Sequence, residues 1–194
     1  MRAGRAAIGG LLLGCLGAGA VGAYQLLGPD WSYKSQPMGE SWQVCTSGMP
    51  SGAAQIIKRA AATWNYSGFR FTFRGDGCSS GGKFPSFNGT NQIDWGGGLP
   101  GSVLARTLIT SEKSTGNSVE CDLRFNAGQP WYVGTGKVPS GRYDLYSVAV
   151  HEFGHCLGLD HSGGGVMQAR IADGSARRSP RSDDIKGRNA IYGQ

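Results

Sequence analysis

The spacing of apolar residues divides the first half of the chain into two strands with a helix between them. Trp42–Thr46 is a short run that predicts a strand. From Ser51 to Trp64 apolar residues recur at helical spacing, with Ser51 placed as the N-cap and Gly68 beyond the end. Phe69–Arg74 alternates phenylalanine with polar residues, which predicts a half-buried strand.

A loop rich in glycine and serine follows, from Gly75 to about Thr90, and the pattern then returns to strands. Turn residues separate three candidate strands, which are Gln92–Trp95, Val103–Thr110 and Val119–Asn126. The middle of the chain is therefore expected to add three strands to the two predicted before it.

Two more helices are predicted in the last third of the chain. Leu145–Leu157 has helical spacing, with Asp144 placed as its N-cap and Gly158 as the residue that ends it. Asp183–Tyr192 forms the second, with Ser182 before it and acidic residues in the first turn, where the helix dipole favours them.

Composition indicates one globular domain behind an export segment. Hydrophobic residues make up 39% of the 194 residues and charged residues 16%, and the 34 glycines indicate long loops and tight turns. We expect a signal peptide at 1–23, a short linker at 24–39 and one folded domain at 40–194.

The first residues have the layout of a secretory signal, with Arg2 and Arg5 ahead of an apolar run and small residues before Tyr24. Cleavage fits after Ala23 and almost as well after Ala20. Two alternatives stay open. A lipobox-like run ending at Cys15 would carry a lipid, and an uncleaved signal would anchor the chain in a membrane.

The charge balance gives little sign of a nucleic-acid partner. Removing the first 23 residues takes away two of 19 basic and none of 13 acidic residues, so the net charge becomes +4 (17 minus 13). There is no long basic run beside an array of aromatic residues. The densest basic cluster, Arg177, Arg178 and Arg181, is expected in a polar loop, either as a solvated face or as a contact for an acidic surface.

Four cysteines remain after Cys15 is removed, which are Cys45, Cys78, Cys121 and Cys156. An even number in an exported chain predicts two disulfides, for which the sequence allows three pairings. Zinc ligation is the alternative, but the four are widely spaced and form no CxxC pair.

The strongest chemical signal is the segment HEFGHCLGLDH, which contains all three histidines of the chain. His151 and His155 are four residues apart and share one face of a helix, so both imidazoles can bind one ion. A left-handed Gly158 would turn the chain back and bring His161 to the same metal. Three imidazoles leave a fourth position open, which is the arrangement of catalytic zinc.

Glu152, next to the first ligand, is the candidate general base. It is placed to take a proton from a water that zinc has made acidic and to pass the proton to the leaving amine. Histidines on a helix are often structural, but here all three occupy motif positions together with a glutamate and a glycine.

HExxHxxGxxH is the metzincin signature, and Ser162 after the third histidine resembles the matrixin branch, which includes the matrix metalloproteinases and their bacterial relatives. The resemblance covers roughly Glu40 to Gly193, and SDDIKGRNAIYG (182–193) resembles the C-terminal helix of the family. It implies an α+β zincin fold. This fold has a twisted five-stranded mixed sheet with one antiparallel edge strand, two long helices and a small C-terminal subdomain with one helix.

The resemblance also implies roles for residues around the metal. Leu104, Ala105 and Arg106 would lie on the edge strand and bind an extended protein or peptide substrate. Met167 would form the Met-turn under the zinc, although a plain core methionine is the alternative. The family's Pro-x-Tyr after the methionine is replaced here by Gln168, Ala169 and Arg170, so the depth of the S1′ pocket stays open.

The order of strands in matrixins favours the disulfides Cys45–Cys78 and Cys121–Cys156. The resemblance also leads us to expect one catalytic zinc, without the second, structural zinc of vertebrate matrixins. Arg106 and Arg124 stand where that site would need histidines, and a cation cannot supply a ligand's lone pair. Calcium is a further possibility, with ligands drawn from Asp76, Asp94 and Asp122.

Taken together, these features predict a secreted zinc endopeptidase, or one anchored at the cell surface through its N-terminal segment. We expect a monomer that contacts a membrane only through a lipid or signal anchor. Two alternatives remain, which are a zinc-containing binding module with little turnover and a factor that cleaves one dedicated protein. Glu152 argues against the binding module, because binding zinc does not require that carboxylate.

Overall fold

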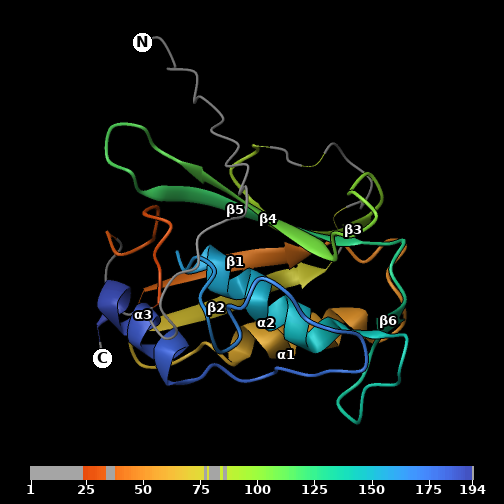
Figure 1. The fold of residues 1–194 in the computed structure, drawn as a ribbon. Coiled ribbons are helices and arrows are strands. Elements are labelled where there is room, and N and C mark those ends of the chain that lie inside the picture. The colour runs from red at the N-terminus through yellow and green to blue at the C-terminus, as the bar shows by residue number, and fades with distance from the viewer. Residues whose placement is uncertain (1–23, 34–37, 77, 79–83, 85–86, 194) are drawn as a thin grey trace.

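The computed structural model describes residues 24–33, 38–76, 78, 84 and 87–193 (Figure 1). The expected signal peptide at 1–23, with the lipobox alternative at Cys15, lies outside the described residues, as does much of the loop expected from Gly75 to Thr90. Within the described part of the chain, none of the helices has the length and apolar character needed to cross a membrane.

A five-stranded mixed sheet forms the centre of the fold, in the order β2-β1-β3-β5-β4. Neighbours are parallel from β2 to β5, and β4 alone runs antiparallel to its partner β5 at the edge. This confirms the fold class expected from the family resemblance. The strands are β1 (Met38–Val44), β2 (Phe69–Asp76), β3 (Asn91–Gly96), β4 (Ala105–Ser111) and β5 (Ser118–Asn126).

The two helices α1 (Ala53–Ala62) and α2 (Leu145–Cys156) lie side by side against the sheet, and α3 (Ser182–Tyr192) lies in the C-terminal part (Figure 1). A second small parallel sheet pairs β6 (Trp131–Tyr132) with β7 (Tyr143–Asp144) just ahead of α2. Sequence reasoning missed this pair because two residues are too few to produce an alternating pattern.

Aromatic side chains fill the space between the sheet and the helices. Trp42 and Phe71 meet edge to face at 4.8 Å between ring centroids, and Phe153 of α2 lies 4.9 Å from Phe71. Trp64, which is fully buried, donates its indole N–H to the carbonyl of Val150 at 2.9 Å. Since Phe153 and Val150 belong to α2, this packing fixes the helix that carries the metal motif.

Both predicted N-caps outside the metal helix differ from the structure by one residue. At α1 the N-cap is Gly52 with φ of 80°, because a glycine adopts this left-handed conformation at low cost, and Ser51 stays outside the helix. At α3 the N-cap is Arg181, whose N–H donates to the carboxylate of Asp184 at 2.7 Å.

Residues 24–33, expected as part of a linker, pack against the end of the metal helix. Trp31 is 1% exposed and donates its indole N–H to the carbonyl of Cys156 at 2.8 Å. Leu27 donates its N–H to the carbonyl of Gly158, and Asp160 donates to the carbonyl of Gln25, both at 2.8 Å. This segment therefore supports the turn between the second and third histidines.

The structure contains the disulfides Cys45–Cys78 and Cys121–Cys156, the pairing that the family resemblance favours. Cys45–Cys78 joins the residue after β1 to the loop after β2. Cys121–Cys156 joins the buried face of β5 to the last residue of α2. Only the second bond holds the metal helix directly.

These two bonds provide a matched test, since they close loops of 33 and 35 residues and should give the same chain-entropy stabilisation of about 4 kcal/mol each. Replacing either pair by alanine should lower the free energy of unfolding by similar amounts. Only the loss of Cys121–Cys156 should also weaken zinc retention, because this bond fixes the end of α2. Chelator competition measures zinc retention in both variants. Equal retention would contradict the idea that Cys121–Cys156 fixes the end of α2.

Candidate metal centre

The helix that carries the first two histidines is capped at both ends. At its start Asp144 accepts a hydrogen bond from the N–H of Ser147 at 3.0 Å, as the sequence predicts. At its end Gly158 has φ of +98°, and its N–H donates to the backbone carbonyl of His155. The N–H of Leu159 donates to the backbone carbonyl of Gly154. This pair of bonds is a Schellman motif, which ends the helix and turns the chain back. His161 follows on the returning chain.

The structure brings the three histidines together through their Nε2 atoms. Nε2 of His151 lies 3.0 Å from Nε2 of His155 and 3.3 Å from Nε2 of His161. Among the described residues, this is the only group of three or more metal-ligating side chains close enough to hold one ion. The residues predicted as ligands therefore converge on one point.

Backbone acceptors fix which nitrogen is available on two of the rings. His151 Nδ1 lies 2.9 Å from the carbonyl of Val166, and His155 Nδ1 lies 2.8 Å from the carbonyl of Leu159. A carbonyl only accepts, so each Nδ1 carries the hydrogen and each Nε2 presents a lone pair. Adjacent lone pairs at 3.0 Å repel each other unless a cation lies between them.

The spacing fits a tetrahedral zinc ion. Bonds of about 2.0–2.1 Å at the tetrahedral angle place ligand nitrogens about 3.3 Å apart, near the separations observed. Burial lowers the pKa of His151 well below its ordinary value and the pKa of His155 to about 4, and both are lowered further by a neighbouring histidine. Burial also lowers the pKa of His161. The rings are therefore neutral near pH 7, as metal ligands must be.

Glu152 is buried beside this cluster, with 6% of its surface exposed. Burial raises its pKa to about 7, an effect partly offset by the hydroxyl of Thr107 and the charge of Arg106. The Thr107 hydroxyl donates to Oε2 of Glu152 at 2.6 Å. The carboxylate thus has a proton affinity suited to taking and returning a proton near neutral pH.

Met167 is buried in the core directly against the metal helix, and its role as the Met-turn stays a prediction. A Cβ on Gly154 would lie 2.3 Å from the Met167 sulfur and 3.1 Å from the Trp64 ring. The glycine between the two helical histidines is therefore required by the close approach of Met167. Gly154 stands at a variable position of the HExxHxxGxxH motif, so the sequence pattern did not reveal this contact.

Asp184 holds the turn that contains Met167. Its buried carboxylate accepts hydrogen bonds from the N–H groups of Val166 at 3.0 Å and Met167 at 3.3 Å. A Cβ on Gly165 would lie 2.1 Å from an oxygen of Asp184, so a side chain there would displace the carboxylate. In the sequence, Asp184 stands out only as an acidic residue in the first turn of α3, where the helix dipole favours it, so this role was not predicted.

The predicted substrate contacts lie at the free edge of the sheet. β4 begins at Ala105, and Leu104 just before it accepts a hydrogen bond from Asn126 of β5 at 2.9 Å. Arg106 is exposed and pairs in register with Arg124, on the face of the sheet away from Thr107 and Glu152. The substrate-binding role of these three residues stays a prediction.

The predicted calcium ligands each have another partner. Asp76 forms an ion pair with Lys58 at 2.7 Å, Asp94 forms a bidentate pair with Arg124, and Asp122 accepts from the N–H of Gln92 at 3.0 Å. Arg124 thus neutralises Asp94 at the position where the resemblance would place a histidine of a second zinc site. Calcium binding stays a prediction.

Comparison with known proteins agrees with this geometry. The family model described as Matrixin matches residues 53–193, which include both capped ends of the metal helix, the three histidines and Met167. The chain belongs to the matrixin family. Matrixins are zinc metalloendopeptidases, and the three-histidine cluster is a group that could hold such an ion.

The matrixin domain is similar to curated proteins from animals and plants. It is 36% identical over 97 residues to neutrophil collagenase of Homo sapiens, covering 48% of this chain and 19% of that protein. It is 33% identical over 100 residues to matrix metalloproteinase-25 of Mus musculus, covering 48% of this chain and 15% of that protein. Metalloendoproteinase 5-MMP of Arabidopsis thaliana is 34% identical over 79 residues, covering 37% of this chain and 22% of that protein.

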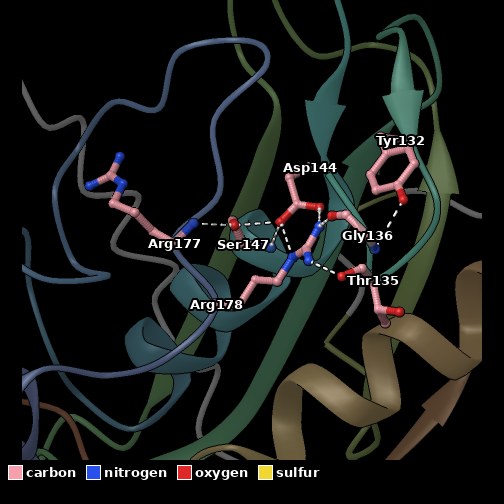
Figure 2. Close-up of polar contacts among 7 residues, drawn as sticks. All are labelled: Tyr132, Thr135, Gly136, Asp144, Ser147, Arg177 and Arg178. Carbon is pink, nitrogen blue, oxygen red and sulfur yellow. Dashed lines mark hydrogen bonds and ion pairs between the residues drawn. The ribbon is translucent and has the colours of Figure 1, made fainter. Parts of the chain in front are cut away.

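In this matrixin Arg178 binds the N-cap residue of the metal helix (Figure 2). Arg178 donates to both carboxylate oxygens of the fully buried Asp144 at 2.8 Å each. The same guanidinium donates to the carbonyls of Thr135 and Gly136. The side chain thus ties the loop after Met167 to the N-cap of α2 and to the loop after β6. Sequence reasoning noted Arg178 only as part of a basic cluster.

Arg177 joins the start of the metal helix to the residues on either side of Met167. Its N–H donates to the hydroxyl of Ser147 at 2.6 Å, as Figure 2 shows. Its guanidinium donates to the backbone carbonyl of Gly165 at 3.2 Å and to the side-chain oxygen of Gln168 at 2.5 Å. Two of the three arginines in the basic cluster are therefore engaged within the domain, while Arg181 is exposed.

We predict that Arg178→Met lowers the free energy of unfolding by about 3–5 kcal/mol, because it leaves the charge of Asp144 buried without its cation. Arg181→Met is the matched control. It removes an exposed guanidinium three residues away and should change stability by about 0.5 kcal/mol or less. Urea unfolding of the two variants measures the difference. Equal effects would show that the Arg178–Asp144 ion pair contributes nothing to the free energy of unfolding.

The raised pKa of Glu152 predicts a pH dependence in the metal-free protein. Because the folded value of about 7 exceeds the ordinary value of 4.5, the contribution of this group to stability is fully present below pH 4.5 and is lost as pH rises through 7. The difference corresponds to about 3 kcal/mol.

Comparing wild type with Glu152→Gln isolates this contribution, since the lowered pKa values of the histidines act in the opposite direction in both proteins. The free energy of unfolding of the wild type, relative to the variant, should fall by about 3 kcal/mol between pH 4.5 and pH 8. A pH-independent difference would show that the folded and unfolded pKa values of Glu152 are alike.

Proposed function

We propose that the chain is an exported zinc-dependent endopeptidase with Glu152 as its general base. The observation that supports this most directly is the convergence of three Nε2 atoms, 3.0 and 3.3 Å apart, beside a buried carboxylate with a pKa of about 7. The matched segments cover 15–22% of the length of the three relatives described above, so their activities come to this chain only as part of the proposal.

His151, His155 and His161 would hold the zinc. When bound, the metal supplies Lewis-acid activation of water and of the scissile carbonyl. Glu152 takes a proton from the water as its oxygen bonds to the carbonyl carbon. As the C–N bond breaks, Glu152 passes that proton to the amine nitrogen, so no covalent enzyme intermediate is required.

An extended peptide would lie along β4. In the described part of the chain β4 pairs only with β5, so its other edge has backbone donors and acceptors available for a substrate. Leu104, Ala105 and Arg106 at the start of this strand are the proposed contacts. The main-chain pairing would supply affinity, and side-chain pockets would supply selectivity.

Export is proposed from the signal-like layout of residues 1–23 and from the two disulfides, which persist in oxidising compartments. Cleavage after Ala23 would release a free enzyme. A lipid on Cys15 or an uncleaved anchor would leave the enzyme attached to the cell surface. We propose that the domain acts as a monomer with one catalytic zinc.

We predict that Glu152→Gln keeps one zinc per chain and the fold but loses peptidase activity by a factor on the order of 10²–10⁴, since it removes the base and leaves the three imidazoles in place. Casein cleavage that chelator abolishes and zinc restores is the assay, with zinc content measured after dialysis against metal-free buffer. Activity within about tenfold of wild type would exclude Glu152 as the base. A wild-type protein that binds zinc and cleaves nothing would favour the binding module instead.

A further inference from the structure

One hydroxyl on the edge strand contacts the proposed general base. Thr107 lies within β4, and its Oγ1 lies 2.6 Å from Oε2 of Glu152 and 3.2 Å from the backbone carbonyl of the same residue. A hydroxyl has one hydrogen to donate, and the shorter contact to a charged acceptor takes it. Burial raises the pKa of this carboxylate, and the side chain and the backbone of Thr107 both stabilise its charged form and so lower that pKa.

The position of Thr107 in the sheet directs its side chain toward the metal helix. Side chains alternate along a strand, and Arg106 before it and Leu108 after it face the other side. Thr107 pairs in register with Leu123, whose side chain is in the core, and β4 packs against α2. The hydroxyl is therefore fixed by the sheet rather than by a loop.

A threonine is well suited to hold a carboxylate in one orientation. Its β-branched side chain has few accessible χ1 angles in a strand, so the hydroxyl loses little freedom when it forms the bond. Glu152, by contrast, has three rotatable side-chain bonds and is buried where its charge is poorly solvated. Without the Thr107 bond, several orientations of the carboxylate would compete.

We propose that Thr107 is a positioning residue for the general base, which holds one oxygen of Glu152 so that the other faces the water and the substrate. This inference rests on the proposed function, because it presupposes that Glu152 moves the proton. Thr107 transfers no proton itself. Its hydroxyl can donate to Oε2 while Oε1 is free and also while Oε1 carries the proton taken from water, so the bond persists through the reaction.

The test uses Thr107→Val, which keeps the branched shape and removes the hydroxyl, and Thr107→Ser, which keeps the hydroxyl. We expect kcat of the valine variant to fall about 10–100-fold, the scale of a misplaced catalytic group, with KM changed less than about threefold. The serine variant should recover most of kcat. Thr72→Val is the matched control, since it makes the same change on β2, where the hydroxyl donates to the carbonyl of Glu40 at 3.1 Å, and should leave kcat unchanged.

A double-mutant cycle separates this inference from the proposed function. Adding Thr107→Val to Glu152→Gln should cost little further activity, because the valine acts through a carboxylate that is already gone. An equal loss in both backgrounds would overturn the positioning role. If Glu152→Gln stays active, the proposed function fails; if it is inactive while Thr107→Val matches wild type, only the role of Thr107 fails.

A structural measurement on the metal-free protein gives a readout independent of activity. A crystal structure of metal-free Thr107→Val should show the Glu152 carboxylate moved from its wild-type position, while the three imidazoles stay in place. An unmoved carboxylate would overturn the proposal. If the valine variant does not fold, Thr107→Ala replaces it in each comparison, with the same expected results.

Discussion

The structure depends on holding three imidazole lone pairs about 3 Å apart. Such an arrangement is unfavourable without a cation, and neutral rings reach it only when other groups hold them. The carbonyls of Val166 and Leu159 do so for two rings, each by accepting a hydrogen bond from Nδ1. Both carbonyls belong to the chain just beyond the helix, so the path of that chain determines the orientation of the ligands.

Three separate contacts fix this path. The N-terminal segment contributes Leu27, which donates to the carbonyl of Gly158 in the turn that ends the metal helix. Met167 packs so closely on Gly154 that no larger residue fits between the two helical histidines. Asp184 then binds the backbone of the turn that contains Met167. Each contact joins segments far apart in sequence, so the site requires the complete domain.

The two ends of the metal helix are held in different ways. At the C-terminal end a disulfide connects Cys156, next to the second histidine, to Cys121 of β5. At the N-terminal end the buried Asp144 caps the helix and forms an ion pair with Arg178. A buried ion pair adds little stability compared with an apolar contact, but it is directional and ties the loop after Met167 to one position. Between these ends, Thr107 of the edge strand reaches the carboxylate of Glu152.

The amino-acid sequence alone determined which three histidines would converge, where the metal helix begins and ends, and the order of the main strands along the chain. These features depend on residues a few positions apart, such as two histidines four residues apart and a glycine that ends the helix. Only the tertiary structure decided the partners of Glu152, Asp144 and Asp184, which are 45, 34 and 17 residues away along the chain. No local pattern marks them, because a single threonine or arginine has the same sequence signature in solvent as beside a buried carboxylate. The fold alone brings these charges and hydroxyls together, and burial makes their contacts strong.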